Sequence, residues 1–331
     1  MPTAIINSLG TYLPKKILTN FDLEKMVDTT DSWIKERTGI EERRIADDEE
    51  TTSVLGFKAA SVALQNGNCS PDEIELIILA TTTSDYPMPS SAALIQAMLK
   101  ATNAGAFDIQ AACSGFIYGL TLAKAYIEAN IYKKILLVAS DKLSSVINYE
   151  DRNTCILFGD GAVAALISNE GEGLEIKTSN LGAEGIYSQH LLIPAGGSKK
   201  PASEDTVKDK LHSVKMEGKE VFKHAIRRMA KSSLECLEKL NIQVKDINWV
   251  IPHQANFRIM ETLAKQLEIP FSKVFRTVHK YGNTSAASVG IALSELLESQ
   301  EVKPKDHLLL TAFGSGFTWG SVILKKTETN D

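Results

Sequence analysis

The segment AFDIQAACSGFIYGLTLAKAYIEAN, residues 106–130, changes from strand-like to helix-like patterning at one cysteine, Cys113. The apolar run 106–112 predicts a short buried strand, and the run 114–130 predicts a helix. Helical spacing places four apolar residues on one face of that helix: Phe116, Leu120, Ala123 and Ile127. A cysteine at a helix N-terminus meets unpaired backbone N–H groups and the positive end of the helix dipole, so we expect a lowered thiol pKa and a reactive nucleophile. A buried structural cysteine is the alternative interpretation.

Two segments of the second half place polar side chains at similar junctions. In WVIPHQAN, residues 249–256, an apolar strand ends at a proline and is followed by His253. In YGNTS, residues 281–285, Asn283 precedes a small-residue helix predicted over 286–297. Taken singly, each residue has a plain alternative, a core histidine or a turn asparagine. Together with Cys113 they indicate one shared site, because junction loops can converge without breaking a sheet.

The composition argues against several classes of protein. The 331 residues suggest two domain-sized units or one duplicated fold, at about 150 residues for each unit. The four cysteines have neither paired nor metal-ligand spacing, which favours free thiols in a reducing, cytoplasmic location. We expect no secretory signal, and no apolar run approaches the roughly 20 residues of a membrane-spanning helix. The net charge of −5 argues against a general nucleic-acid binder.

The same order of elements is predicted twice along the chain. Strands, helices and a polar junction recur in both halves: 76–80, 90–100, Cys113, 114–130 and 135–139, then 249–251, 257–267, Asn283, 286–297 and 308–311. We therefore predict two related α/β halves, residues 1–172 and 173–331, that meet near residues 171–173. Alternating strands and helices predict mainly parallel sheets covered by helices.

Several longer motifs are spread over nearly the whole chain: DSWIKERTGIEERR (31–44), AACSGF (111–116), DRNT…FGDGA (151–162), PHQANFRI (252–259), GNTSAAS (282–288) and FGSGFTWGS (313–321). Together they resemble β-ketoacyl-acyl carrier protein synthase III, the initiating condensing enzymes of bacterial fatty acid synthesis within the thiolase superfamily. The resemblance implies a thiolase-like α/β fold, in which two duplicated halves stack as a layered αβαβα sandwich with the active site between them. It also implies a homodimer. No P-loop and no zinc-ligand spacing occurs in the sequence, so we expect no metal or redox cofactor.

Condensation of two thioesters needs a nucleophile, an oxyanion hole and donors that stabilise an enolate. Cys113 suits the first role, because a thiol is a strong protein nucleophile. The backbone N–H groups of Cys113 and of Ser315, in a glycine turn, would form the oxyanion hole. His253 and Asn283 would donate to the thioester oxygen of a malonyl group, and the resemblance implies the same roles. Elongating condensing enzymes carry a second histidine at the position of Asn283, so the resemblance implies the initiating type.

A candidate coenzyme A site lies near the N-terminus. Trp33 and Arg37 are four residues apart and share one face of a short helix that is predicted to begin at Thr30 or Asp31 and to end at Gly39. Tryptophan can stack on adenine and arginine can hold phosphate, although a core tryptophan beside a solvated arginine explains the same spacing. The resemblance implies that Trp33, Arg37 and Arg152 contact coenzyme A and that Asn256 touches its pantetheine arm.

A basic stripe recurs every four residues on one predicted helix: Lys219, Lys223, Arg227 and Lys231. A solvated helix face is the plain explanation of this stripe. Acyl carrier protein is acidic, however, and an acidic enzyme needs local positive charge to attract it. The resemblance supports Lys223, Arg258 and Lys265 as docking residues for acyl carrier protein.

Three residues are predicted to shape the acyl pocket: Met88, Leu143 and Phe313. Phe313 corresponds to a family phenylalanine beside the cysteine. Met88 stands where many relatives carry a phenylalanine that closes the pocket from the neighbouring subunit. Because methionine is flexible, we expect this pocket to admit acyl groups longer than acetyl.

Other functions share some of these features. A related condensing enzyme of secondary metabolism would have the same motifs and a different second substrate. A cysteine hydrolase would use the Cys–His–Asn set without consuming malonyl groups, and a non-catalytic scaffold would not need the set. The GxGxxA pattern at residues 159–164 resembles a dinucleotide loop, but the apolar run after it predicts a strand where such a loop needs a helix.

Overall fold

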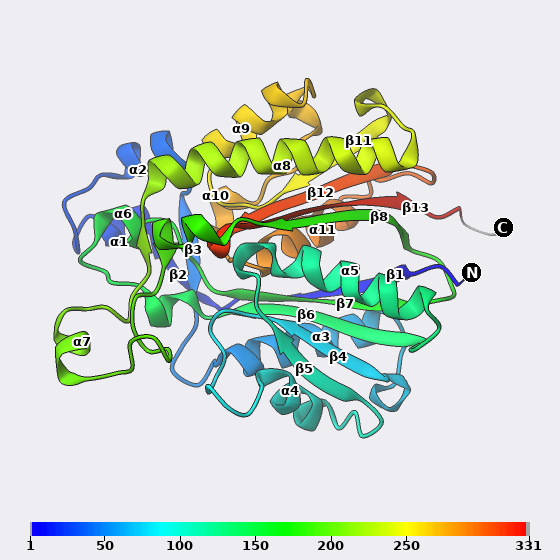
Figure 1. Cartoon of the computed structure of the whole chain (residues 1–331), viewed down its shortest axis with the longest axis horizontal. Helices are drawn as coiled ribbons and strands as arrows, with labels where there is room; N and C mark the ends of the chain where they lie inside the picture. The colour runs from blue at the N-terminus through cyan, green and yellow to red at the C-terminus, as the bar shows by residue number, and fades with distance from the viewer. Residues whose placement is uncertain (1, 329–331) are drawn as a thin grey trace.

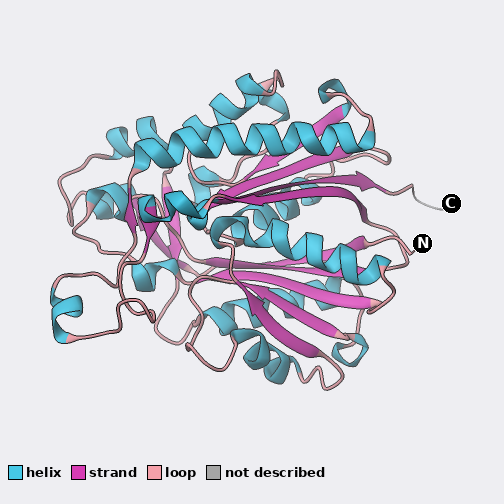
Figure 2. Ribbon diagram, in the orientation of Figure 1, coloured by secondary structure: helices cyan, strands magenta, loops and turns pink. Residues whose placement is uncertain are grey.

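The computed structural model of this protein describes residues 2–328 and arranges them in five layers, helix, sheet, helix, sheet and helix (Figure 1, Figure 2). The long helix α8 (Gly218–Leu240) and α9 (Phe257–Gln266) cover one outer face. Helices α3 (Thr52–Asn66) and α4 (Ser91–Leu99) cover the other. The layered α/β architecture expected from the resemblance is confirmed.

The middle layer consists of α5 (Gly115–Glu128) and α11 (Ala287–Glu298), which lie between the two halves of the sheet. The apolar face predicted for α5 is buried in the largest core cluster. Helix α11 approaches its neighbours so closely that a Cβ added at Gly290 would lie 2.6 Å from Val163 Cγ1 and 3.1 Å from Phe116 Cζ. Close packing in this layer therefore leaves no room for a side chain at Gly290.

Nine strands form one sheet in the order β11-β12-β13-β8-β1-β7-β6-β4-β5. Their bounds are β1 (Ile5–Tyr12), β4 (Leu76–Ala80), β5 (Gly105–Ile109), β6 (Lys134–Asp141), β7 (Gly161–Ser168), β8 (Leu174–Ala183), β11 (Ile247–Pro252), β12 (His307–Gly314) and β13 (Thr318–Lys326). The two halves of the sheet join where Ile5 pairs with Glu175 and Ile6 pairs with Leu174, and Ile176 N donates to Ala4 O at 2.9 Å. Each half has its own outer helices, and both halves pack on the shared middle layer.

The prediction of mainly parallel sheets was wrong. Strand β4 runs parallel to β5 and β6, and β11 runs parallel to β12, but β1, β7, β8 and β13 pair antiparallel with their neighbours. Strands β12 and β13 are joined by the 3₁₀ turn Ser315–Phe317, which is too short for the helical crossover that a parallel pair needs. The apolar patterns predicted where the strands lie in the sequence, but not which neighbouring strands run parallel.

The predicted repeat of strands and helices is observed with small shifts at the ends. The strand expected at 76–80 is β4, and the helix expected at 114–130 begins with the 3₁₀ turn Ala112–Ser114 and continues as α5. The division into residues 1–172 and 173–331 stays a prediction. At that junction Gly173 has a φ of +154°, and a Cβ there would lie 2.0 Å from Ile6 O, so glycine is required.

Shorter elements lie at one end of the nine-stranded sheet (Figure 1). They are the pairs β2 (Lys16–Thr19) with β3 (Glu42–Ile45) and β9 (Leu191–Leu192) with β10 (Lys215–Met216), and the helices α1 (Asn20–Leu23), α2 (Asp31–Thr38), α6 (Arg152–Cys155), α7 (Glu204–Lys208) and α10 (Val278–Tyr281). Helix α2 begins and ends as predicted, since Thr30 Oγ1 accepts from Trp33 N and Gly39 adopts a φ of +75°. Among residues 2–328, no helix is both long and apolar enough to cross a membrane.

Candidate active site

Cys113 sits on a strained turn between β5 and α5. Ala112, directly before it, has a φ of +45°, a left-handed conformation that costs a residue with a side chain about 1–3 kcal/mol. Ser114 Oγ lies 2.6 Å from Ala111 O and 2.8 Å from Thr318 Oγ1, so the turn is tied to the start of β13. The sharp turn leaves Cys113 partly exposed at the wall of a cavity.

The turn after β12 lies directly against the backbone of Cys113. A Cβ added at Gly314 would be 2.7 Å from the Cys113 nitrogen, so only glycine permits this approach. Gly316, with a φ of +113°, returns the chain into β13. The backbone N–H groups of Cys113 and Ser315 lie in these two adjoining turns. The oxyanion hole that the sequence predicts at these two groups stays a prediction.

His253 follows the end of β11 and points at the same cavity. Its backbone N–H donates to Thr311 O at 2.8 Å, which extends the parallel pairing of β11 and β12 by one residue. The imidazole Nδ1 lies 2.6 Å from Ser288 Oγ on α11. The residue is only 5% exposed, and this burial lowers the pKa of His253 to about 3. The imidazole is therefore neutral at physiological pH.

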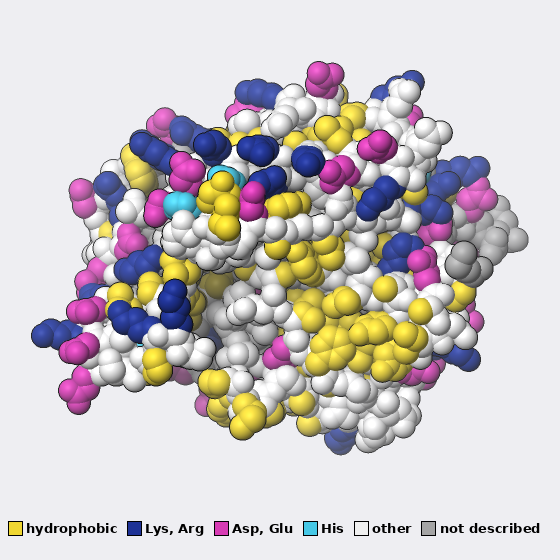
Figure 3. Space-filling view, in the orientation of Figure 1, with side chains coloured by type: hydrophobic (Ala, Val, Ile, Leu, Met, Phe, Trp, Pro, Cys, Tyr) yellow, Lys and Arg dark blue, Asp and Glu magenta, His cyan; other side chains and the backbone are white. Residues whose placement is uncertain are grey.

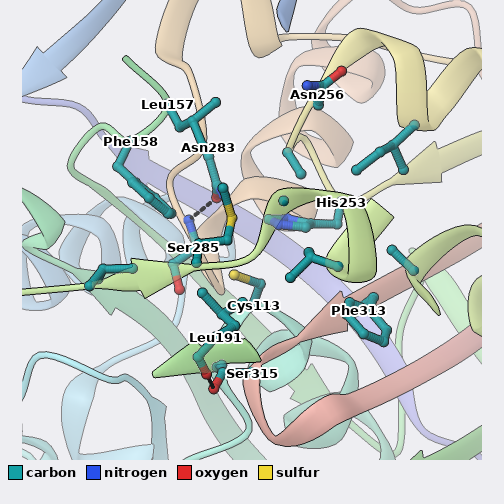
Figure 4. A pocket seen from close by; sticks show the side chains of 18 of the residues that line it. Cys113, Leu157, Phe158, Leu191, His253, Asn256, Asn283, Ser285, Phe313 and Ser315 are labelled. Atoms are coloured by element: carbon teal, nitrogen blue, oxygen red, sulfur yellow. Dashed lines mark hydrogen bonds between the residues drawn. The ribbon is translucent and has the colours of Figure 1, made fainter. Parts of the chain in front are cut away.

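Asn283 is held by residues from the first half of the chain. Its backbone N–H donates to Leu157 O at 2.8 Å, and its carbonyl accepts from Gly159 N at 3.0 Å. Its side-chain Oδ1 accepts from Ser285 N at 2.8 Å (Figure 4). Because the amide oxygen is occupied, the amide N–H₂ group is the part directed toward Cys113.

The thiol of Cys113 does not have the lowered pKa that its place at a helix start predicted. Desolvation in the cavity raises the pKa to about 12, although hydrogen bonds from Ser285 and Asn283 act in the opposite direction. The buried carboxylate of Asp141 disfavours the thiolate further. The free protein therefore holds Cys113 as a neutral thiol.

Cys113, His253 and Asn283 line one cavity of about 1100 Å³. Figure 4 shows these three side chains around a common space, each reaching it from a different segment of the chain. The predicted pocket residues Leu143 and Phe313 also line this cavity. The wall contributed by β9, β10 and α8 is apolar and includes Leu191, Leu192, Met216, Phe222 and Ala225. This combination of apolar walls and a few polar groups is typical of a site for a small molecule.

The predicted coenzyme A residues lie at the exposed end of this cavity. Trp33, Arg37 and Asn256 line it, and the guanidinium groups of Arg37 and Arg152 each lie 5.0 Å from the centroid of the Trp33 ring. Arg152 does not line the cavity itself, and its Nη1 donates to Asp28 O at 2.8 Å. Asn256 also caps α9, because its Oδ1 accepts from Arg258 N at 2.8 Å.

The predicted docking residues are exposed around the same end. Figure 3 shows basic side chains in a row over α8, the helix that carries Lys223. Arg258 lines the cavity and lies 3.7 Å from Glu36, whereas Lys265 pairs with Glu261 at 3.1 Å and lies outside the lining. Such exposed ion pairs are weak, so the positive charge of this surface remains largely available to a partner.

Met88 lies outside the cavity and is 85% exposed. Its loop is held at the base by Asp85, whose Oδ1 accepts from Ser53 N at 2.9 Å and from Ser91 Oγ at 3.0 Å. Within one chain Met88 does not shape the acyl pocket. Its predicted role therefore requires a second copy of the chain.

Three buried polar residues that sequence reasoning did not single out hold the site in place: Arg43, Asp141 and Ser288. Arg43 Nη2 donates to Ile156 O at 2.7 Å in the cavity wall. Asp141 accepts from Thr82 N at 2.8 Å and links the end of β6 to the start of α11. Arg43 and Ser288 lie in motifs quoted above, but the sequence pattern does not distinguish a buried polar residue from a solvated one.

No group of three or more His, Cys, Asp or Glu side chains in the described part of the chain could hold a metal ion. The four cysteines are all unpaired. The GxGxxA segment leads into β7, a strand, as its apolar run predicted, so the helix that a dinucleotide loop needs does not follow it.

Comparison with known proteins gives consistent matches. Two family profiles match, 3-oxoacyl-[acyl-carrier-protein (ACP)] synthase III over residues 107–185 and 3-oxoacyl-[acyl-carrier-protein (ACP)] synthase III C terminal over residues 237–326. A beta-ketoacyl-[acyl-carrier-protein] synthase III of Chlamydia muridarum is 53% identical over 98% of this chain and 99% of its own length.

Solved structures agree with these matches. The 3-oxoacyl-[acyl-carrier-protein] synthase III of Aquifex aeolicus VF5 is 46% identical with a TM-score of 0.90, covering 97% of this chain and 99% of that one. The priming beta-ketosynthase of the R1128 polyketide biosynthetic pathway is 32% identical, also with a TM-score of 0.90, and covers 99% of this chain and 97% of its own. Sequence motifs, fold and comparisons lead to the same assignment, and the chain belongs to the 3-oxoacyl-[acyl-carrier-protein] synthase III family.

Proposed function

We propose that this protein is the initiating condensing enzyme of bacterial type II fatty acid synthesis. It transfers an acetyl or short acyl group from coenzyme A to Cys113 and condenses it with malonyl-acyl carrier protein to give 3-oxoacyl-acyl carrier protein. The observation that carries this proposal is the meeting of Cys113, His253 and Asn283 in one cavity with Trp33 and Arg37 at its exposed end. The free cysteines suit the reducing cytoplasm, where we expect it to act.

In the first half-reaction, the Cys113 sulfur attacks the thioester carbonyl of acyl-coenzyme A. The oxyanion that forms is bound by the N–H groups of Cys113 and Ser315, and the coenzyme A thiolate then leaves. Because the pKa of the free thiol is raised to about 12, its proton must leave as the carbon–sulfur bond forms. The departing coenzyme A thiolate accepts a proton, so the exchange needs no net proton from solvent.

In the second half-reaction, the malonyl group loses carbon dioxide and its bonding electron pair moves toward the thioester oxygen. Neutral His253 and the Asn283 amide donate hydrogen bonds to that oxygen and stabilise the enolate, each by about 3–4 kcal/mol. The carbanion attacks the acyl carbonyl on Cys113 and forms the new carbon–carbon bond. The Cys113 thiolate leaves and takes up one proton, which restores the resting thiol.

Coenzyme A would bind at the exposed end of the cavity. The Trp33 ring can stack on adenine, the guanidinium groups near it can hold phosphates, and Asn256 lines the same cavity as Cys113. The acidic acyl carrier protein would approach the same end over Lys223 of α8 and over Arg258 and Lys265 of α9. Both substrates then deliver their thioesters through one opening.

We further propose a homodimer in which Met88 of one protomer enters the cavity of the other and limits the acyl chain. Strand β5 is an edge of the sheet and pairs only with β4 in the described chain. Figure 3 shows hydrophobic side chains gathered over α5 and β5, which is the composition of a subunit interface. The exposed Met88 loop, fixed at Asp85, is presented rigidly to a partner.

A second candidate is the priming of a specialised pathway, which the likeness to the polyketide priming ketosynthase favours. The two functions share the first half-reaction and differ in primer and carrier protein. Nothing in the site favours a cysteine hydrolase or a scaffold over them. Rates with acetyl, butyryl and octanoyl coenzyme A, each with the carrier proteins of both pathways, distinguish the two candidates.

Intact-mass measurement after incubation with acetyl-coenzyme A tests the proposal. We expect one acetyl group on the native protein, none on Cys113→Ala, and discharge of the adduct into a ketoacyl product on addition of malonyl-acyl carrier protein. A native protein that takes no acyl group from any coenzyme A thioester contradicts the proposed function.

A further inference from the structure

Ser288 is a buried serine of α11 that faces the imidazole of His253. Its Oγ lies 2.6 Å from His253 Nδ1 and 3.3 Å from the backbone nitrogen of Gln254, and the residue is 1% exposed. Within residues 2–328 these are its two side-chain hydrogen bonds. Ser288 has no place in the mechanism given above, yet its hydroxyl is the closest polar partner of a catalytic ring.

The hydrogen of the Ser288 hydroxyl can be placed by elimination. The Gln254 N–H can only donate, so Ser288 Oγ accepts from it. The hydroxyl hydrogen then needs an acceptor, and His253 Nδ1 is the only acceptor in contact with it among the described residues. If Nδ1 carried a hydrogen instead, Ser288 Oγ would accept twice, and its own hydrogen would be buried without a partner, which is unfavourable.

We propose that Ser288 is a positioning residue that holds His253 in the tautomer with its hydrogen on Nε2. The inference rests on the proposed function, in which His253 donates to the malonyl thioester oxygen. A neutral imidazole carries one N–H, so an acceptor at Nδ1 requires the donor at Nε2. No partner for Nε2 exists within the described chain, so this donor is left for the substrate in the cavity.

The proposal predicts different effects of Ser288 on the two half-reactions. An Nε2–H group donates to the developing enolate oxygen but cannot accept a proton from the Cys113 thiol. Loss of the Ser288 hydroxyl should therefore slow decarboxylation and condensation while acyl transfer to Cys113 continues. A merely structural role of Ser288 would slow both steps together.

The experiment compares Ser288→Ala with two other variants. Ser288→Thr keeps the hydroxyl, and Ser294→Ala is the matched control, because Ser294 is a buried serine of the same helix whose Oγ bonds to Glu298 Oε1 at 3.1 Å. Acylation is followed by intact mass, and condensation by single-turnover release of labelled carbon dioxide from malonyl-acyl carrier protein on pre-acetylated enzyme.

For Ser288→Ala we expect condensation to fall by about 10- to 100-fold, less than the roughly 10²–10³-fold loss of a complete oxyanion donor. Acylation should stay within about twofold of the native rate, Ser288→Thr should recover part of the loss, and Ser294→Ala should match the native protein. If Ser288→Ala condenses at the native rate, or if acylation falls in parallel, the proposal is overturned.

Nitrogen NMR of histidine-labelled native protein reads the tautomer directly, with His253→Gln assigning the signals. We expect a protonated Nε2 and an unprotonated Nδ1, and a protonated Nδ1 in the native protein overturns the proposal whether or not the alanine variant folds. A native protein that performs neither half-reaction contradicts the proposed function instead, and the tautomer measurement still decides the role of Ser288.

Discussion

At the scale of single residues, burial rather than helix geometry sets the charge of the nucleophile. Cys113 stands at the start of a helix, which favours a thiolate. The loss of water around the thiol outweighs this influence and raises the pKa, and the charge of Asp141 raises it further. The thiol reacts only when a thioester is present to drive its deprotonation. The resting protein is thereby protected from untargeted alkylation and oxidation, which attack the thiolate.

The alkylation of Cys113 should consequently depend steeply on pH. In the free protein, we expect its rate of reaction with iodoacetamide to rise continuously through pH 9 with no plateau, since the pKa is raised to about 12. Peptide mass spectrometry follows Cys113 separately from Cys69, Cys155 and Cys236. A half-maximal rate below pH 8 would contradict this prediction.

His253 should make the stability of the protein fall in mild acid. Its pKa is about 3 in the folded protein, against about 6.5 in the unfolded chain, so below pH 6.5 only the unfolded chain binds the proton. The free energy of unfolding therefore rises with pH between 3 and 6.5, and His253 alone lowers it by about 2 kcal/mol at pH 5 relative to pH 7.

Urea unfolding of the native protein and of His253→Gln at pH 5 and pH 7 measures this contribution of His253 to the free energy of unfolding. The two proteins share all their other ionisable groups, so the contributions of those groups cancel in the difference between them. Equal pH dependence in the two proteins would show that His253 does not stay neutral on folding at pH 5.

At the scale of elements, the middle layer has no room for a side chain at Gly290. Gly290→Ala would place a Cβ 2.6 Å from Val163 Cγ1, and we expect a loss of about 1–3 kcal/mol in the free energy of unfolding. Gly197→Ala is the control, because a Cβ there would meet nothing within 4 Å. Urea titration of both variants is the measurement, and equal stability would mean that α11 moves to accept the methyl group.

The elements that could be predicted from the sequence are those whose signal is local. The strand at 76–80, the face of α5 and both ends of α2 follow from apolar spacing and capping residues. Strand directions depend on how connections run across the sheet, and the pKa of Cys113 depends on which residues exclude water from it. Such properties arise between segments far apart in the chain, so no local pattern carries them.

The residues of the candidate site also fall into two groups, those with a local sequence signal and those without one. The junction residues Cys113, His253 and Asn283 were found from their local setting, and the cavity brings them together. Ser288 and Asp141 were passed over, because a buried serine or aspartate has the same sequence signature as a solvated one. Their importance depends on what they touch in the folded chain.

At the scale of the whole molecule, the protein is acidic but concentrates positive charge where a carrier protein would dock. Charge reversal by Lys223→Glu should raise the KM for malonyl-acyl carrier protein by about tenfold, with less effect at high salt and none on acylation by acyl-coenzyme A. Lys303→Glu is the control, since Lys303 precedes β12 and the site lies at the other end of that strand. Equal KM values for the two variants would remove the α8 surface as the docking face.

The pairing of Asn283 with Leu157 and Gly159 joins the two halves at the level of the active site. The amide that we propose as a donor to the enolate lies in residues 173–331, but its backbone is bonded to residues 1–172. Cleavage of the chain near residue 172 would leave Cys113 on one fragment and His253 and Asn283 on the other. We expect a protein split there to be active only when both fragments reassemble.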